Sequence, residues 1–202
     1  MYQQLIPSPE CNIGTLAAML EVLVLGAEGS GKSLLIRKLK QLYNHSVEGD
    51  EDQSESTIPT VGVDISTFRV KDIEFSVREI GATMASKWNS YIPDCVALLF
   101  VIDVSDLGML ASNLVLLYEV LANRRHFRNK PFAILFNKVD LVCDPNSIAV
   151  VYNTLRIGDL IEDENDLTTV ILSGSSLSKE SAPFCVQKWI QSFLEYQTTG
   201  GT

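Results

Sequence analysis

Eight consecutive residues near the start of the chain combine the glycines and side chains that bind a polyphosphate. They match the phosphate-loop pattern G-x-x-x-x-G-K-[ST] and end in Lys32 and Ser33. Glycines in such a loop allow a tight turn and a close approach of the backbone to phosphate oxygens. The Lys32 ammonium suits the β- and γ-phosphates, and the Ser33 hydroxyl suits Mg²⁺. The residues expected at this site are Gly26, Ala27, Glu28, Gly29, Ser30, Gly31, Lys32 and Ser33.

The segments on either side of this loop are the ones that would position it. Residues 22–25 form a short apolar run, typical of a strand that is buried on both faces. After the loop, Leu35, Leu39 and Leu42 fall on one stripe at helical spacing. A strand, a glycine-rich loop and a helix in this order direct the loop N–H groups and the positive end of the helix dipole at one place. Both flanks together favour an anion site over a glycine turn that merely caps a helix.

The remaining chain alternates apolar runs with stretches of helical spacing. Two alternating segments on either side of Lys71-Asp72 predict a hairpin at a sheet edge. The whole pattern predicts an α/β fold with a doubly wound, mostly parallel sheet and an antiparallel edge strand. The expected strands are 22–25, 61–70, 73–77, 96–103, 132–137 and 170–172, and the expected later helices are 110–121 and 184–194.

A doubly wound sheet binds its ligand beyond the carboxyl ends of its strands, so polar residues that follow the strands should converge there. They are Lys32 and Ser33, Glu79, the segment Asn137 to Asp140, and Ser173 with Gly174.

The segment Asn137-Lys138-Val139-Asp140 indicates which base the site would accept. A carboxylate such as Asp140 can accept hydrogen bonds from both N1–H and the 2-amino group of guanine. Adenine lacks that amine, and leaving the carboxylate unpaired would cost binding energy. Lys138 can lay its aliphatic stem along the base, and Asn137 can brace the phosphate loop. Combined with that loop, the motif favours guanine over adenine.

Composition and charge limit the classes of function. The chain has 202 residues, of which 46% are hydrophobic and 20% charged, as in a soluble globular protein of one domain. Its net charge of −9 at pH 7 argues against nonspecific binding to nucleic acid or anionic lipid. The scattered cysteines show no C-x-x-C spacing and favour a reducing, cytoplasmic location. They are Cys11, Cys95, Cys143 and Cys185.

We expect a leader at 1–19, a GTP-binding domain at 20–197 and a tail at 198–202. Within the domain, residues 45–57 are acidic and predict a solvated loop. Tyr2 stands where myristoylation needs glycine, and the chain ends without a prenylation cysteine, so we expect no encoded lipid anchor.

With these motifs in place, the chain resembles a small GTPase of the ADP-ribosylation-factor-like family from about Glu21 to the last helix. The resemblance implies a P-loop NTPase fold of the small-GTPase type, with GTP or GDP and Mg²⁺ as ligands. Thr60, in the run P-T-V-G, resembles the switch-one threonine that closes onto Mg²⁺ and the γ-phosphate. Ser173 and Gly174 resemble the last guanine loop, whose backbone N–H faces the base.

The second switch departs from the family pattern W-D-x-G-G-Q. Glu79 stands where the family has the aspartate that holds a magnesium-bound water, so the resemblance implies a role for Glu79 through water. Gly81 and Ala82 occupy the two glycine positions, and the Ala82 N–H would donate to the γ-phosphate. Arg78 replaces the tryptophan and is interpreted as a surface residue.

Thr83 replaces the glutamine that orients the attacking water in the family. A threonine hydroxyl is too short to hold water in line and also stabilise the transition state. Phosphoryl transfer in this class depends mainly on positioning and charge, so the catalytic set of Lys32 and the degenerate Thr83 predicts slow hydrolysis without loss of binding.

Two functions from different classes remain open. The first is a nucleotide-dependent switch that controls membrane or ciliary traffic, with effector, exchange-factor and GTPase-activating proteins as partners implied by the resemblance. The second is a constitutively GTP-bound interaction module. A nucleotide kinase or ATPase is a third alternative, which Asp140 opposes. We expect a cytoplasmic protein that partners recruit to membranes or cilia.

Overall fold

The structure is a computed structural model that describes residues 20–43, 60–123, 125, 130–144, 146–162 and 168–198. The expected leader (1–19), the acidic loop (45–57) and the final residues of the tail (199–202) lie outside the described residues. The domain limits therefore stay predictions.

Within the described residues, six strands form one sheet in the order β2-β3-β1-β4-β5-β6. Only the β2–β3 pair is antiparallel among these strands, as the sequence predicts. The strands are β1 (Glu21–Gly26), β2 (Val63–Val70), β3 (Ile73–Ile80), β4 (Ala97–Asp103), β5 (Pro131–Asn137) and β6 (Thr168–Ser173).

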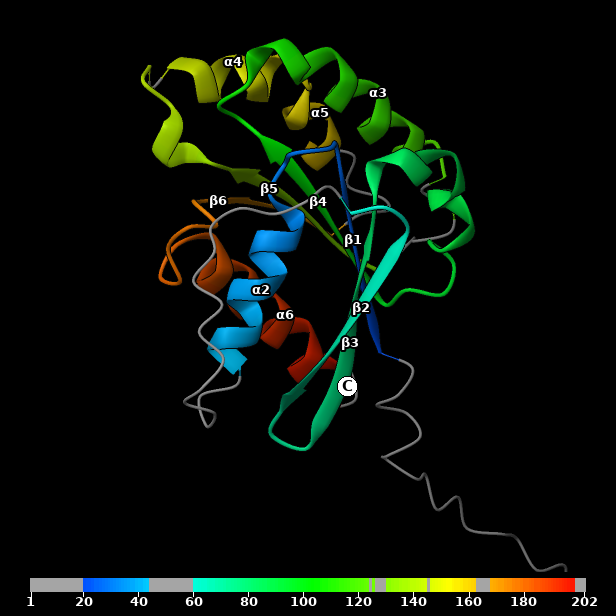
Figure 1. Cartoon of the computed structure of the whole chain (residues 1–202). Helices are drawn as coiled ribbons and strands as arrows, with labels where there is room; N and C mark the ends of the chain where they lie inside the picture. Colours follow the sequence, from blue (N-terminus) through cyan, green and yellow to red (C-terminus); the bar gives the residue numbers. More distant parts are fainter. Residues whose placement is uncertain are drawn as a thin grey trace, which may run out of the picture.

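Helices cover both faces of the sheet (Figure 1). Helices α2 (Lys32–Tyr43) and α6 (Ala182–Thr198) lie on one face, and α3 (Leu110–Leu121), α4 (Asn146–Thr154) and α5 (Ile157–Glu162) lie on the other. The short 3₁₀ segments are η1 (Ala82–Ser90), η2 (Leu107–Met109) and η4 (Val139–Leu141). No helix within the described ranges is long and apolar enough to cross a bilayer.

Strand β1 shows why its sequence is apolar without alternation. Val22 and Val24 belong to the buried cluster that includes α2 and α6 side chains, whereas Leu23 and Leu25 belong to the cluster on the α3 side. All four side chains are at most 1% exposed. A strand between two helical layers must be apolar on both faces, which confirms the prediction of a doubly wound sheet.

The hairpin forms as predicted, with Lys71 in the left-handed conformation (φ 55°) at its turn. Its apolar residues are not all inside. Phe68 is buried, but Ile65 is 52% exposed, because it lies on the other face of strand β2 at the edge of the sheet. Helical spacing is expected after residues 132–137, but the sequence patterns did not define the bounds of α4 and α5 and did not indicate η1; these elements contribute few residues to the two buried clusters.

Candidate nucleotide-binding site

The glycine-rich loop follows β1 directly and leads into α2, whose first residue is Lys32. Gly31 shows why the sequence needs glycine here. Its φ is +92°, and a Cβ on it would overlap the side-chain nitrogen of Asn137. Ala27 and Ser30 are buried, whereas Glu28 and Gly29 are exposed at the outer turn. The loop therefore joins a strand to the start of a helix as the sequence predicts, which is the arrangement that typically binds anions.

Lys32 is only 5% exposed. Its ammonium donates to the carbonyl oxygens of Gly26 (3.0 Å) and Ala27 (2.7 Å) and to Ser30 Oγ (3.4 Å). Burial lowers the pKa of Lys32 to about 8, against the opposing effect of the carboxylates of Glu79 and Glu28. An anion beside the loop would offset the cost of burying this charge.

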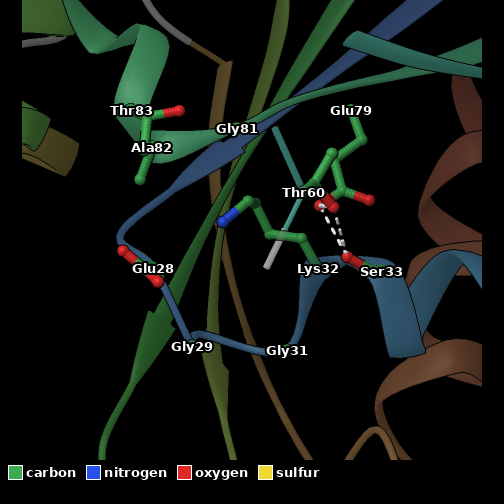
Figure 2. Close-up of a pocket in the computed structure, with 10 residues that line it drawn as sticks. All are labelled: Glu28, Gly29, Gly31, Lys32, Ser33, Thr60, Glu79, Gly81, Ala82 and Thr83. Atoms are coloured by element: carbon green, nitrogen blue, oxygen red, sulfur yellow. Dashed lines mark hydrogen bonds between the residues drawn. The ribbon is translucent and has the colours of Figure 1, made fainter. Parts of the chain in front are cut away.

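A cavity of about 140 Å³ opens in front of the loop. Figure 2 shows Glu28, Gly29 and Gly31 on one side of it and Ala82 and Thr83 on the other. The cavity is lined by Glu28, Gly29, Gly31, Lys32, Ser33, Thr60, Glu79, Gly81, Ala82 and Thr83. These residues come from three separate segments of the chain, 28–33, Thr60 and 79–83, so the fold brings the predicted phosphate and switch residues together.

Three side-chain oxygens from different segments meet at this cavity (Figure 2). Ser33 Oγ lies 2.9 Å from Thr60 Oγ1, and both hydroxyls donate to Glu79 Oε1, at 2.8 and 3.0 Å. Glu79 is 2% exposed although it is a carboxylate. Hydroxyl and carboxylate oxygens are the donors that Mg²⁺ prefers, so this set fits the metal that the family resemblance implies.

The two switch segments contact each other beside these oxygens. The Gly81 N–H donates to the Gly62 carbonyl oxygen at 2.9 Å. Gly81 has ordinary dihedral angles (φ −58°, ψ 146°), but a Cβ on it would overlap the Thr60 carbonyl oxygen. Glycine is therefore required here for close approach and not for backbone freedom. Ala82 is half-buried, and Thr83 is exposed at the start of η1.

Asn137 links the loop to the predicted base-binding segment. Its side-chain nitrogen donates to the Ser30 carbonyl oxygen at 2.8 Å, as the sequence analysis expects. Its side-chain oxygen accepts hydrogen bonds from the backbone N–H and the hydroxyl of Ser176, both at 2.9 Å. Asn137 is fully buried, so these contacts are well protected from water.

The other base-side residues lie at the same end of the sheet, outside the cavity described above. Lys138 adopts the left-handed conformation (φ 63°), and its ammonium pairs with Asp103 Oδ2 at 2.6 Å. Asp140 is exposed in η4, and Ser173 is exposed at the end of β6. The Gly174 N–H donates to the Phe136 carbonyl oxygen at 3.0 Å, which ties the last loop to β5.

Sequence reasoning missed two residues in this region, Ser176 and Asp103. Ser176 bonds Asn137, and Asp103 holds Lys138 while it accepts from the Ser105 N–H and hydroxyl. Asp103 ends strand β4, so the rule that polar residues after parallel strands converge would have found it. Ser176 lies in the loop after β6, two residues beyond Gly174, and no motif in the sequence marks it.

Comparisons with known proteins agree with this arrangement. Residues 12–190 match the model of the ADP-ribosylation factor family. Human ADP-ribosylation factor-like protein 16 is 34% identical over 152 residues, which cover 75% of this chain and 76% of the human protein.

A solved structure of the Arl6 BBS3 small GTPase from Trypanosoma brucei, with the bound nucleotide analogue GppNp, superposes with a TM-score of 0.69. The match covers 88% of this chain and 98% of the other at 23% sequence identity, and it supports the same fold.

Proposed function

The chain belongs to the ADP-ribosylation factor family of small GTPases, and on this premise we propose that it is a guanine-nucleotide switch that binds GTP and GDP with Mg²⁺ and hydrolyses GTP slowly. One observation carries the proposal. The loop after β1, the switch residues Thr60 and Glu79, and Asn137 at the end of β5 all lie at one end of the sheet.

The phosphate loop would hold the polyphosphate. Its backbone N–H groups and the start of α2 attract anions, and Lys32 adds a charge that is already desolvated. A buried ammonium gains more from an anion than an exposed one, because less of its interaction is screened by water. Lys32 is therefore the residue in this loop whose loss should weaken binding most.

Base recognition would depend on Asp140, with Lys138 and Asn137 as supports. Asn137 fastens this segment to the phosphate loop through Ser30, so the two halves of the nucleotide would be held at a set spacing. The ion pair with Asp103 anchors the end of the Lys138 side chain, which supports its proposed place along the base. Asp140 is exposed and available for the two donors of guanine.

Ser33 and Thr60 would hold the magnesium ion, with Glu79 acting through a water molecule as the family resemblance implies. When bound, Mg²⁺ neutralises charge on the β- and γ-phosphates. Thr60 and Gly81 lie on the two segments that a γ-phosphate would keep in contact, and an effector would recognise that ordered pair. We propose effector, exchange-factor and GTPase-activating proteins as partners on the basis of family membership.

Location and pathway follow from the same premise. We propose a cytoplasmic protein that such partners recruit to membranes or cilia, where it regulates traffic. Family membership and the acidic net charge of −9, which disfavours direct attachment to anionic lipid, support this assignment.

One observation favours the second candidate, a constitutively GTP-bound interaction module with negligible turnover. The switch segments already contact each other through Gly62, Gly81, Thr60 and Glu79. If those contacts persist with either nucleotide, a partner would not distinguish the two states. The nucleotide released by denaturing the purified protein separates the candidates. A mixture of GDP and GTP supports a cycling switch, and GTP alone supports the module.

Titration of the full chain with fluorescent GTP in magnesium tests the proposal itself. We expect saturable binding that unlabelled GTP and GDP displace and ATP does not. A Lys32→Ala variant should bind at least tenfold more weakly, because one charge-assisted contact is lost. Absence of binding, or equal competition by ATP, would contradict the assignment.

A further inference from the structure

We propose that Glu79 is a direct ligand of the magnesium ion, beside Ser33 and Thr60, and takes the place of a water molecule. The inference rests on the proposed function. It departs from the water-mediated role that the family pattern suggests for the shorter aspartate, and it concerns a residue by which this chain differs from that pattern.

The spacing of the three oxygens is the first argument. Magnesium prefers octahedral coordination with oxygens at about 2.0–2.1 Å, so neighbouring ligand oxygens lie about 2.8–3.0 Å apart. The oxygens Ser33 Oγ, Thr60 Oγ1 and Glu79 Oε1 form a triangle with edges of 2.8, 2.9 and 3.0 Å. The triangle therefore has the dimensions of one face of a magnesium octahedron.

The length of the side chain is the second argument. Glutamate carries one more methylene than aspartate, which adds about 1.5 Å of reach, the length of one carbon–carbon bond. Here that reach brings a carboxylate oxygen level with two hydroxyls that are themselves proposed ligands. An aspartate on the same backbone would withdraw from the triangle and leave space for a water between itself and the metal.

The electrostatic surroundings of Glu79 are the third argument. Its side chain is 2% exposed, and the hydrogen bonds described for it come from the neutral hydroxyls of Ser33 and Thr60. The Lys32 ammonium interacts with Glu79 electrostatically but donates its hydrogen bonds to Gly26, Ala27 and Ser30. A buried carboxylate is costly unless positive charge compensates it, and a divalent cation in direct contact would compensate it more strongly than this more distant ammonium.

The proposal predicts a count of water ligands. Six positions surround the ion, and Ser33, Thr60 and Glu79 would fill three of them. Oxygens of the β- and γ-phosphates would fill two more, which leaves one water. A water-mediated Glu79 would leave two.

Electron paramagnetic resonance with Mn²⁺ can measure this count, because Mn²⁺ accepts the same oxygen ligands and water enriched in ¹⁷O broadens its signal. The sample is the full chain with Mn²⁺ and a non-hydrolysable GTP analogue. We expect one bound water in the wild-type complex and two in Glu79→Asp, the matched variant that keeps the charge and shortens the side chain.

The outcomes separate this inference from the proposed function. Two waters in the wild-type complex would overturn the direct contact and leave GTP binding intact. The wild-type count decides this even if Glu79→Asp does not fold. If the chain binds no GTP analogue with Mn²⁺, both the proposed function and this inference fail.

A second readout is the affinity for Mg²⁺ at saturating nucleotide. Glu79→Gln keeps the length but removes the charge, and we expect its dissociation constant for Mg²⁺ to rise at least tenfold. An unchanged constant would contradict direct coordination by a carboxylate.

Discussion

Thr83 lies on the cavity wall opposite the phosphate loop, at the start of η1 and exposed to solvent. A residue there would be well placed to orient a water next to a γ-phosphate, but threonine has only a short hydroxyl for that task. The lining of this cavity thus includes the residues that we propose to bind phosphate, but it has a threonine where the family has the longer amide of glutamine. Binding and hydrolysis should therefore respond to different substitutions.

The first prediction concerns Thr83. Thr83→Gln should raise the single-turnover rate of GTP hydrolysis at least tenfold, because the amide oxygen can accept from the attacking water while the amide N–H stabilises the transition state. Radiolabelled GTP bound to the full chain provides the assay. Thr83→Val is the matched control, since it keeps the shape without the hydroxyl and should stay as slow as the wild type. A hydrolysis rate in Thr83→Gln that is equal to or lower than that of the wild type would contradict this prediction.

The second prediction concerns Asp140, which we propose as the residue that selects the base. Asp140→Asn should weaken GTP binding on the order of 100-fold, since an amide cannot accept from both guanine donors. The same change should improve binding of xanthosine triphosphate, which carries a carbonyl oxygen where guanine has its 2-amino group. Competition titrations with GTP and xanthosine triphosphate measure this change in base preference. If the variant still prefers GTP over the xanthine nucleotide, Asp140 does not recognise the base.

Strands β1 and β3 are joined by more than backbone hydrogen bonds. Arg78 on β3 makes a two-pronged contact with Glu21 on β1, at 2.8 and 2.7 Å, and its guanidinium lies 5.3 Å from the centre of the Tyr91 ring. The hydrogen bond to Glu21 raises the pKa of Arg78 above its ordinary value. The arginine is thus a part of the sheet's architecture, in place of the free surface residue that the sequence suggested.

The third prediction concerns how much the ion pair between Arg78 and Glu21 stabilises the fold. The side chains of Arg78 and Glu21 are 24% and 16% exposed, so Glu21→Gln should lower the free energy of unfolding by about 1–2 kcal/mol. Arg69 and Glu74 form an exposed pair on the neighbouring hairpin, and Glu74→Gln should cost less than about 0.5 kcal/mol. Urea unfolding at one fixed nucleotide concentration measures both. If both variants lose the same free energy of unfolding, the half-buried pair is no more stabilising than the exposed one and the prediction is wrong.

At the scale of the whole molecule, the residues that the structure describes form two buried clusters on either side of one sheet, with the proposed ligand at the strand ends. A nucleotide would contact loops that follow β1, β3 and β5, and so would bind only when these strands are in place. Ligand binding to the folded state alone stabilises it by mass action, by about 2.7 kcal/mol at a hundred times the dissociation constant.

Two cysteines can be used to measure this stabilisation of the folded state by nucleotide. Cys95 is 1% exposed, and burial raises the pKa of its thiol to about 11. Only about one such thiol in a thousand is ionised at pH 8, and that fraction rises tenfold per pH unit until the pKa is reached. Cys143 is exposed.

The fourth prediction uses these two thiols in one sample. Iodoacetamide at pH 8 should modify Cys143 quickly and Cys95 only on opening of the fold. Saturating GTP and Mg²⁺ should slow Cys95 modification by up to about 100-fold and leave Cys143 unaffected. Peptide mass spectrometry follows both rates. Rapid labelling of Cys95 in the folded protein, or no protection by nucleotide, would contradict this coupling.

Much of the fold could be predicted from the sequence because the deciding signals are local. The loop from Gly26 to Ser33, the apolar run before it and the helical stripe after it are contiguous, and they specify a strand, an anion site and a helix without reference to distant residues. Continuous apolar runs at β4 and β5 likewise require helices on both faces. Helices α4 and α5, of nine and six residues, are too short to give a strong periodic pattern.

The sequence by itself determined which motifs are present: a phosphate-loop pattern, the segment Asn137 to Asp140 that we propose to recognise the base, and a threonine in place of the family's glutamine. The tertiary structure alone decided how those parts touch. Ser33 meets Thr60 and Glu79 across 27 and 46 residues of chain, and Asn137 reaches Ser30 across 107. Such contacts depend on strand order and side-chain length together, so no local pattern reveals that one added methylene puts a carboxylate oxygen beside both hydroxyls.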